Sequence, residues 1–385
     1  MSRGREVAIV GVGATQHRKR FTGTTSLELT VGALDAALAD AGLRRPDVDG
    51  VALEWPGPGG HPGDPESWSV PLGRDLSWAA QARVDCLGIR GVLHAAAAVS
   101  AGLCEVAAVG GAQTGLLGGR VGNPVPEEFT DIWGAYPVPL FGLLAARHMH
   151  EFGTTPEQLA AVAVSIRNQG YRNPEAVMFG AAPITVDDVL SSRMIASPFH
   201  LLDCCITAEG GGVVLVTSAE RARDLRGGTV AILGGALRYH QVGYRNTPLY
   251  RDLAGLDLGA ARATYRAADL TPDDVDVLAL YDSNTFEVIR QLEALGVCAV
   301  GEGGPYVESM GIGPGSPVPV NLDGGLLSFA WNGGQHTTLR VIEAVRQLRG
   351  TAVHPVAGAR VAMVANTAGA CYAHFLALGE ADIGT

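Results

Sequence analysis

Two short loops place reactive side chains and glycines directly before an expected helix, an arrangement suited to chemistry on a carbonyl group. The first loop contains Asp85 and Cys86, and the second contains Gly333, Gly334 and His336. A helix N-terminus carries a partial positive charge, which lowers the pKa of a nearby thiol and stabilises an oxyanion. Cys86 is therefore either a nucleophile for a thioester or a buried structural thiol. His336 is either an acid–base group or a surface residue that hydrogen-bonds at the helix start.

A second group of polar residues follows expected buried segments. Tyr281 and Asp282 end an apolar strand, and Asp323 stands directly before Gly324 and Gly325. Tyr281 belongs either to the core or to a site, while Asp282 either lines a site or caps the helix that follows. Asp323 is either an acid–base group or a turn residue. The two glycines permit a tight turn and a close approach of the backbone to a thioester oxygen.

Two other kinds of chemistry fit the sequence poorly. Schiff-base catalysis needs a desolvated lysine, and the single lysine, Lys19, stands in a basic and solvated stretch. His148 and His150 are two residues apart on an expected helix, so their side chains point to different sides. The six cysteines show no CxxC spacing. We therefore expect no metal site and no disulfide framework.

Three segments of the chain recur in the same order, which predicts an α/β fold built from two similar halves. Each half follows the order strand, helix, strand, excursion, helix, strand, and the strands are continuous apolar runs typical of a sheet covered on both faces. The predicted halves are 1–225 and 226–385. The paired segments are 7–13 with 230–236, 39–53 with 266–280, and 105–111 with 360–366.

The first half is longer because it contains an insert at about 115–198, which we expect to form a lobe over the site. Helices are expected in it around 138–152 and 156–169. Such a lobe commonly shapes the access of a substrate to its site. The first helix of the chain is also well marked, since Thr25 and Glu28 have the spacing of a capping box, Leu27 opens an apolar stripe and Gly42 ends the helix.

Composition excludes several classes of protein. The chain has 385 residues, 47% of them hydrophobic, and a net charge of −11, so it can fill more than one core but offers no basic surface for nucleic acid. Residues 91–112 are the longest apolar stretch, but His94 and Glu105 interrupt it, so no membrane span is expected. The first residues show the pattern of a strand and not that of a signal peptide. The cysteines show no disulfide framework, which suits a reducing compartment. We expect a cytoplasmic protein.

Several motifs resemble the thiolases, and more closely their lipid-transfer-protein branch, which is associated with sterol metabolism. The resemblance covers nearly the whole chain. It implies a duplicated, layered αβαβα fold that acts on acyl-CoA thioesters, with coenzyme A present only as part of the substrate and no separate cofactor. The motifs are Tyr281-Asp-Ser-Asn-Thr-Phe286, Gly301-Glu-Gly-Gly-Pro305, Pro319-Val-Asn-Leu-Asp-Gly-Gly-Leu-Leu327 and Glu343-Ala-Val-Arg-Gln-Leu-Arg-Gly350.

The catalytic set of a thiolase, however, is not intact. The position of the nucleophilic cysteine falls on Asp85, with Cys86 one residue further along. The two histidine positions fall on Asp323 and Trp331, and the position of the second cysteine falls on Ala365. The lipid-transfer branch also includes aldolases, and the resemblance implies tyrosines as their acid–base groups. One of those tyrosines would lie where this chain has Trp331.

The main hypothesis is therefore a carbon–carbon lyase, a retro-aldolase acting on a β-hydroxyacyl-CoA such as a steroid side chain. Tyr281, Asp323 or His336 would move the protons, and no covalent cysteine is needed. One alternative is an acyltransferase or condensing enzyme that uses Cys86. The other is a non-catalytic acyl-CoA-binding subunit, which the tryptophan at 331 favours. The residues expected to bind the substrate are Asp85, Asp282, Gly324, Gly325, Trp331, Gly333 and Gly334.

The resemblance also implies partners. Thiolase-fold proteins are typically homodimers, and members of this branch often pair with a small OB-fold, zinc-ribbon protein that helps to hold the CoA substrate. We expect the same two kinds of partner here.

Overall fold

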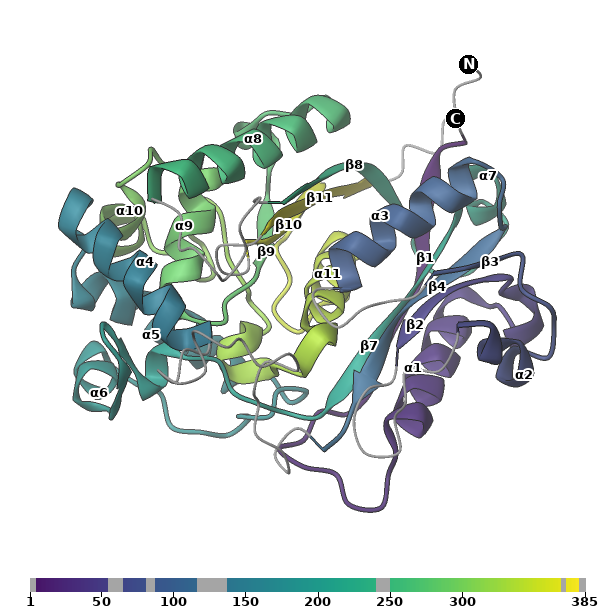
Figure 1. The fold of residues 1–385 in the computed structure, drawn as a ribbon, viewed down its shortest axis with the longest axis horizontal. Helices are drawn as coiled ribbons and strands as arrows, with labels where there is room; N and C mark the ends of the chain where they lie inside the picture. The colour runs from purple at the N-terminus through teal and green to yellow at the C-terminus, as the bar shows by residue number, and fades with distance from the viewer. Residues whose placement is uncertain are drawn as a thin grey trace, which may run out of the picture.

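The computed structural model describes residues 5–54, 65–80, 87–115, 137–239, 250–367 and 372–380. Its centre is a nine-stranded mixed sheet with the strand order β3-β2-β4-β7-β1-β8-β11-β10-β9 (Figure 1). The strands are β1 (Val7–Ala14), β2 (Gly50–Glu54), β3 (Trp78–Ala79), β4 (Val106–Gln113), β7 (Gly210–Ser218), β8 (Val230–Tyr239), β9 (Val277–Leu280), β10 (Val361–Asn366) and β11 (Tyr372–Glu380).

The strand order is mirrored about the contact between β1 and β8. The order β1, β7, β4, β2 on one side matches β8, β11, β10, β9 on the other, and the recurring segments supply β1 with β8, β2 with β9 and β4 with β10. The two halves join through a short antiparallel contact, Ala8 with Ala231 and Ile9 with Val230, so they share one continuous sheet. The predicted boundary at 225/226 falls between α7 (Ala219–Ala222) and β8.

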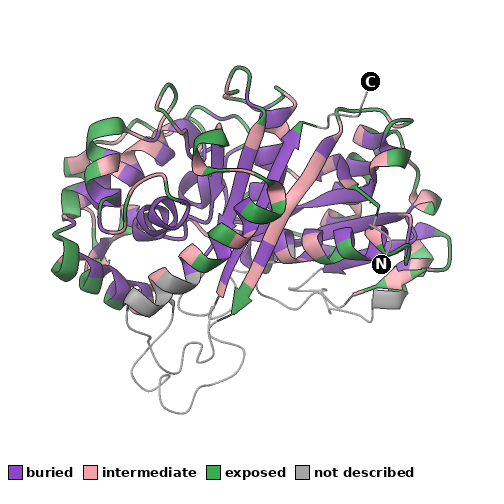
Figure 2. Cartoon of the chain, turned by 90° about the horizontal axis from the view of Figure 1, so that it is seen from above, coloured by how far each residue is buried: buried purple, intermediate pink, exposed green. Residues whose placement is uncertain are grey.

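Helices cover the sheet in layers. One outer helix in each half, α1 (Ser26–Ala41) or α8 (Tyr250–Ala268), packs on the strands of its own half. Between them, α3 (Leu87–Ser100) and α11 (His336–Leu348) contact each other and strands from both halves. Figure 2 shows the strands mostly buried beneath helices whose outer faces are exposed. The layered α/β fold predicted from the sequence is confirmed.

The N-terminal turns of the two central helices meet, as predicted. The Gly88 N–H donates to Thr337 Oγ1 at 2.9 Å. A Cβ atom on Gly88 would lie 2.3 Å from the backbone of Thr337 and Thr338, so only glycine permits this approach. The two helix starts that could carry chemistry therefore converge in space.

The first helix begins and ends where the sequence indicates. Thr25 and Glu28 form the predicted capping box, and Gly42 ends the helix with a φ of 71°. The predicted stripe is only partly correct, because Leu27 is 37% exposed. The helix buries small residues such as Ala33 and Ala37 instead, beside Leu34 and Leu38, because β1 approaches closely at Gly11 and Gly13.

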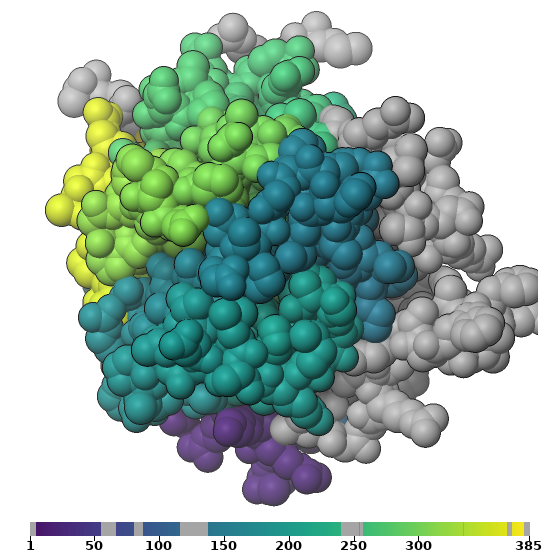
Figure 3. Space-filling model, turned by 90° about the vertical axis from the view of Figure 1, so that its left-hand side faces the viewer, coloured from purple at the N-terminus to yellow at the C-terminus, as the bar shows by residue number. Residues whose placement is uncertain are grey.

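The inserted lobe contains the two predicted helices, α4 (Pro137–Phe152) and α5 (Pro156–Gly170). It docks on the second half, as the teal and green regions of Figure 3 show. His148 lies at this junction, fully buried, with Nε2 2.9 Å from Glu293 Oε1 and Nδ1 2.9 Å from Thr154 Oγ1. After α5, the first half continues with α6 (Val186–Ser191), β5 (Met194–Ala196) and β6 (Phe199–His200). The second half also contains α9 (Thr285–Ala294) and α10 (Gly303–Met310).

Candidate functional site

Three aromatic rings lie together at the start of α11. The Tyr281 ring, directly after β9, packs on the His336 ring with centroids 4.8 Å apart and planes at 37°. The Trp331 ring stacks on the same imidazole at 6.2 Å and 18°. Trp331 is held by its backbone, which pairs with Ile206 and Ala208. The structure therefore brings together three of the residues predicted from the sequence.

His336 is neutral at physiological pH. Burial lowers the pKa of His336 to about 4; the bond to Gly333 opposes the shift and the nearby Arg340 guanidinium adds to it. Its Nδ1 is hydrogen-bonded to the carbonyl oxygen of Gly333. A carbonyl only accepts, so Nδ1 carries the proton and Nε2 carries the lone pair. Of the two uses predicted for His336, the structure excludes a surface role, since the residue is 5% exposed.

Gly333 is required by the geometry of this turn. It has a φ of 69°, and a Cβ atom there would lie 1.7 Å from Gln113 Oε1 at the end of β4. Gly334 belongs to the same turn, Gly333–Gln335. The turn is tied to the first half, because Gln335 Nε2 donates to Glu54 Oε2 at 2.9 Å. The glycines thus let the loop reach both halves at once.

Asp282 does not cap α9, which corrects one of its two predicted uses. That helix is capped by Asn284, whose side chain accepts from the Glu287 N–H. Asp282 is fully buried and accepts instead from the Leu326 and Leu327 N–H groups at 2.8 and 3.3 Å. Burial raises the pKa of Asp282 to about 6, although Arg340 and these N–H groups oppose the shift. Asp282 therefore holds the π-helical turn Gly325–Phe329.

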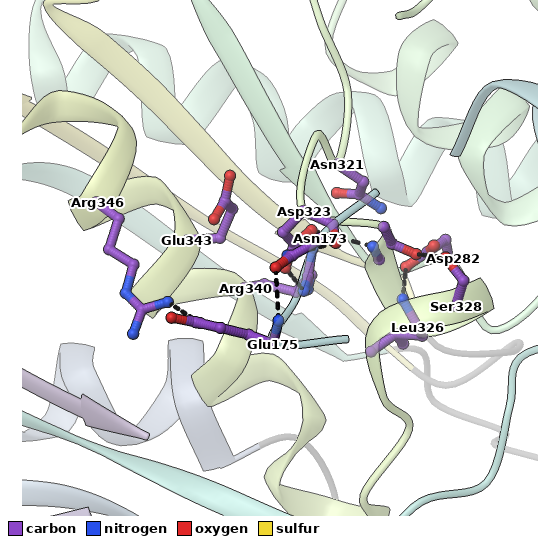
Figure 4. A network of polar contacts seen from close by, with 12 residues as sticks. Asn173, Glu175, Asp282, Asn321, Asp323, Leu326, Ser328, Arg340, Glu343 and Arg346 are labelled. Carbon is purple, nitrogen blue, oxygen red and sulfur yellow. Dashed lines mark hydrogen bonds and ion pairs between the residues drawn. The ribbon is translucent and has the colours of Figure 1, made fainter. Parts of the chain in front are cut away.

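Asp323 forms a buried ion pair with Arg340 (Figure 4). Arg340 Nη1 donates to Asp323 Oδ1 at 2.7 Å, and Nη2 donates to Oδ2. The Gly325 N–H adds a third bond to Oδ1 at 3.0 Å. Both carboxylate oxygens are thus occupied by the protein itself. This geometry favours the turn-residue interpretation of Asp323 over the acid–base interpretation.

Gly324 and Gly325 face the protein interior, which does not fit the predicted use of their backbone for substrate binding. The Gly324 N–H donates to the Asn321 carbonyl, and the Gly325 N–H is taken by Asp323. Gly324 packs on Gly170, and a Cβ atom on Gly325 would lie 2.0 Å from Asp282 Oδ2. Neither N–H group is available to a thioester oxygen in this structure.

Further charged residues, for which the sequence analysis gave no individual role, lie near the Asp323–Arg340 pair. Burial and the neighbouring Asp323 raise the pKa of Glu343 to about 8. Arg346, further along α11 than Arg340, pairs with Glu175 of the lobe (Figure 4). The i, i+3 spacing of these residues on α11 was the available signal. This spacing indicates that the charged side chains share one face of the helix, but it does not indicate that the face is buried.

Two of the residues predicted for the site remain to be placed. Asp85 and Cys86 lie outside the described residues. Cys204 and Cys205 are partly buried against the core, and burial raises the pKa of both thiols, that of Cys204 to about 12. Neither is activated as a nucleophile. In the described parts of the chain, no group of three or more His, Cys, Asp or Glu residues is arranged to hold a metal ion.

A surface groove of about 930 Å³ lies apart from the aromatic cluster. It is lined by residues of the second half together with the end of α5, including Arg172, Tyr306 and His354, and by none of the residues of the cluster. We place the candidate site at Tyr281, Trp331 and His336 because those side chains combine acid–base groups with a helix start. The groove also has a tyrosine and a histidine, but the start of neither central helix lines it.

Comparisons with known proteins decide the family. A steroid enzyme of Mycobacterium tuberculosis, "17-hydroxy-3-oxo-4-pregnene-20-carboxyl-CoA lyase", is 34% identical over 93% of this chain and 95% of its own length. The "Steroid side-chain-cleaving aldolase" of Thermomonospora curvata is 34% identical over 90% and 91%. The family model "Thiolase C-terminal domain-like" matches residues 256–379. The chain belongs to the thiolase family, in its lipid-transfer-protein branch.

Solved structures agree with this membership. The "Ltp2-ChsH2(DUF35) aldolase" structure has a TM-score of 0.86 and 30% identity, and the match covers 100% of both chains. A more distant thiolase, the acetyl-CoA acetyltransferase of Bacillus anthracis, has a TM-score of 0.72 at 14% identity, covers 98% of this chain and 100% of its own, and supports the fold alone. The predicted class of protein, a thiolase-like aldolase or acyltransferase, is confirmed by these relatives.

Three of the positions that the resemblance assigns to the thiolase catalytic set lie among the described residues. Ala365, at the position of the second cysteine, is buried in β10, where its carbonyl accepts from the Tyr281 N–H at 2.9 Å. The other two are Asp323 and Trp331, where the resemblance implies the histidines. Within the described ranges, no helix is long and apolar enough to cross a membrane.

Proposed function

We propose that this protein is a carbon–carbon lyase that cleaves a β-hydroxyacyl-CoA by a retro-aldol reaction. The observation that carries the proposal is the contact between Tyr281 and the neutral His336 at the converging helix starts. The lyases among its relatives support the reaction class. Their names also support a steroid side chain as the acyl group, and the coenzyme A thioester would be the only coenzyme involved.

The reaction requires three events that the site can serve. A base removes the proton of the β-hydroxyl group, the bond between the α and β carbons breaks, and its electron pair forms the thioester enolate. An acid then returns a proton to the α carbon. The products are a ketone or aldehyde and a shortened acyl-CoA, so atoms and charge balance without a further reactant.

We assign the base to His336 and the acid to Tyr281. His336 Nε2 carries the lone pair at neutral pH and receives the hydroxyl proton. The Tyr281 phenol, whose ring packs on that imidazole, protonates the enolate, and a proton then passes from the imidazolium to the phenolate. The N-terminal turns of α3 and α11 supply the positive end of two helix dipoles near the developing oxyanion.

Trp331 forms the wall of this site and does not move protons, because an indole cannot exchange a proton at neutral pH. Its stacking on His336 fixes the plane of the imidazole. The acid–base work assigned to a tyrosine at this position in the aldolases is therefore carried here by His336. This assignment keeps an aldolase reaction compatible with the tryptophan.

The test is mass spectrometry of the purified protein after incubation with acyl-CoA and β-hydroxyacyl-CoA thioesters, including steroid side-chain thioesters. Free ketone or aldehyde with a shortened acyl-CoA, and no acyl group on the protein, is the expected result. A stable acyl adduct on Cys86 would instead identify a condensing enzyme. Binding of all the thioesters without any product would identify a binding subunit.

We further propose two partners and a location. The protein forms a homodimer and pairs with a small OB-fold, zinc-ribbon subunit, a pairing supported by the DUF35 chain of the related Ltp2-ChsH2 aldolase structure. It acts in the cytoplasm. Size-exclusion chromatography with light scattering of the protein alone, and with a candidate DUF35 protein, tests both associations. Elution at the mass of one chain in both runs would contradict them.

A further inference from the structure

Helix α9 is unusual because all ten of its residues are buried, including Glu287, Arg290 and Gln291. Buried polar side chains are costly unless each finds hydrogen-bond partners. Their partners here are not neighbouring side chains alone. They include the backbone at the ends of β9 and β10, where the candidate site begins.

The Gln291 side chain hydrogen-bonds both the carbonyl and the N–H of the Tyr281 backbone. Its Nε2 donates to the Tyr281 carbonyl at 2.7 Å, and its Oε1 accepts from the Tyr281 N–H at 3.3 Å. Nε2 also bonds the Glu287 carbonyl at 2.7 Å, which ties the amide to its own helix. A fully buried side chain therefore holds the Tyr281 backbone, together with the Ala365 carbonyl of β10.

Arg290 and Glu287 hydrogen-bond Thr367, directly after β10. Arg290 Nη1 donates to the Thr367 carbonyl at 3.0 Å, and Thr367 Oγ1 donates to Glu287 Oε2 at 2.7 Å. Asp257 on α8 receives two bonds from Arg290, at 2.6 and 3.1 Å, and completes a buried cluster. β10 in turn hydrogen-bonds Tyr281 through Ala365.

The mirrored half holds the corresponding strand end differently. Ala112 at the end of β4 corresponds to Thr367 at the end of β10 in the recurring segments. The Ala112 N–H is held at 2.9 Å by the hydroxyl of Thr30 on α1, a neutral group. The strand end beside Tyr281 is instead held by a buried arginine with two carboxylates.

We propose that α9 is the positioning element of the site, and that Gln291, with Arg290 and Glu287, fixes the placement of the Tyr281 side chain for proton transfer. These are positioning residues, because they act through Tyr281 and Thr367. The inference rests on the proposed function. A misplacement of about 1 Å in a catalytic group can reduce turnover by about 100-fold. Loss of the hydrogen bonds from Gln291 to the Tyr281 backbone is therefore expected to lower turnover strongly.

The experiment compares Gln291→Met with Gln347→Met. Gln347 is a matched control, because it is also buried and its amide also grips backbone, the Val356 N–H at 2.9 Å and the His354 carbonyl at 3.0 Å. It lies well along α11 from His336, about 16 Å along the helix axis. Both variants are assayed for kcat and KM on the cleaved thioester, and for hydrogen–deuterium exchange of the peptide that contains Tyr281.

Gln291→Met is expected to lower kcat by about 100-fold with KM changed by less than about 3-fold, because the loss falls on the transition state. It is also expected to speed amide exchange at Tyr281, while Gln347→Met does neither. Equal losses of kcat in both variants, or an unchanged kcat in Gln291→Met, would overturn the inference.

The exchange measurement separates this inference from the proposed function, because it needs no substrate. If the unaltered protein cleaves no thioester, the proposed function fails. In that case, faster amide exchange at Tyr281 in Gln291→Met but not in Gln347→Met would still support the role of Gln291 in holding the Tyr281 backbone. Unchanged exchange in Gln291→Met would overturn that role too.

Discussion

The rings of Tyr281 and His336 pack with their centroids 4.8 Å apart, in a part of the molecule where both residues are buried. The pairing places a phenol beside an imidazole that holds its proton on Nδ1. Two side chains that can exchange protons therefore lie side by side in the candidate site, and each can be substituted separately.

Tyr281→Phe is expected to reduce kcat by about 100-fold to 10,000-fold, the usual contribution of a positioned acid or base. The thermal unfolding midpoint should change little, since the phenyl ring keeps the packing on His336. Steady-state kinetics and thermal unfolding measure the two effects.

Tyr265→Phe is the matched control for that variant. The Tyr265 hydroxyl donates to the buried Leu295 carbonyl at 2.9 Å, away from the aromatic cluster. Its removal should cost about 1–3 kcal/mol of stability because a buried acceptor loses its donor, yet kcat should hold. A Tyr281→Phe variant with full turnover would show that Tyr281 is not the acid.

His336 should make the protein sensitive to acid. Its pKa in the folded state, about 4, lies below the ordinary value of 6.5, so the unfolded chain binds a proton first as pH falls. The folded state therefore loses stability between pH 6.5 and 4, by about 2 kcal/mol at pH 5 and about 3 kcal/mol in full. Above pH 6.5 the residue adds no pH dependence.

His336→Asn removes the titrating group and keeps an N–H donor for Gly333. Urea unfolding at pH 7.5 and pH 5 should show a smaller loss of stability in this variant than in the unaltered protein. His17 and His374, whose pKa values burial lowers to about 4 and about 3, titrate in both proteins and cancel in the difference. Equal losses in both proteins would contradict the buried, neutral state of His336.

The sequence predicted the fold better than it predicted the roles of individual residues. The recurring apolar segments predicted the paired strands, and the capping box of Thr25 and Glu28 marked a helix start, because these signals are local. The role of Asp323 depends on Arg340, 17 residues away, and that of Asp282 on the N–H of Leu326, 44 residues away. Such partners are set by tertiary structure, so spacing alone could not reveal them.

Asp323→Asn should destabilise the protein by about 3–5 kcal/mol, because it leaves the buried Arg340 charge without its partner. This expectation replaces the view of Asp323 as a removable acid–base group. Adding Arg340→Met to Asp323→Asn should recover most of the loss, since both charges of the pair are then absent. Urea unfolding of Asp323→Asn, Arg340→Met and the double variant measures this coupling. A single variant as stable as the unaltered protein would show that the pair is not formed.

Cys86→Ser is expected to keep turnover within about 3-fold of the unaltered protein, because retro-aldol cleavage passes through no acyl-enzyme and the hydroxyl replaces the thiol at similar size. Iodoacetamide treatment should likewise leave cleavage intact unless the added group blocks the site physically. Cys104→Ser serves as the control for reagent specificity, since Cys104 is buried and burial raises its pKa to about 12. A Cys86→Ser variant that loses turnover together with an acyl adduct seen in the unaltered protein would assign the nucleophile to Cys86. The reaction would then be acyl transfer.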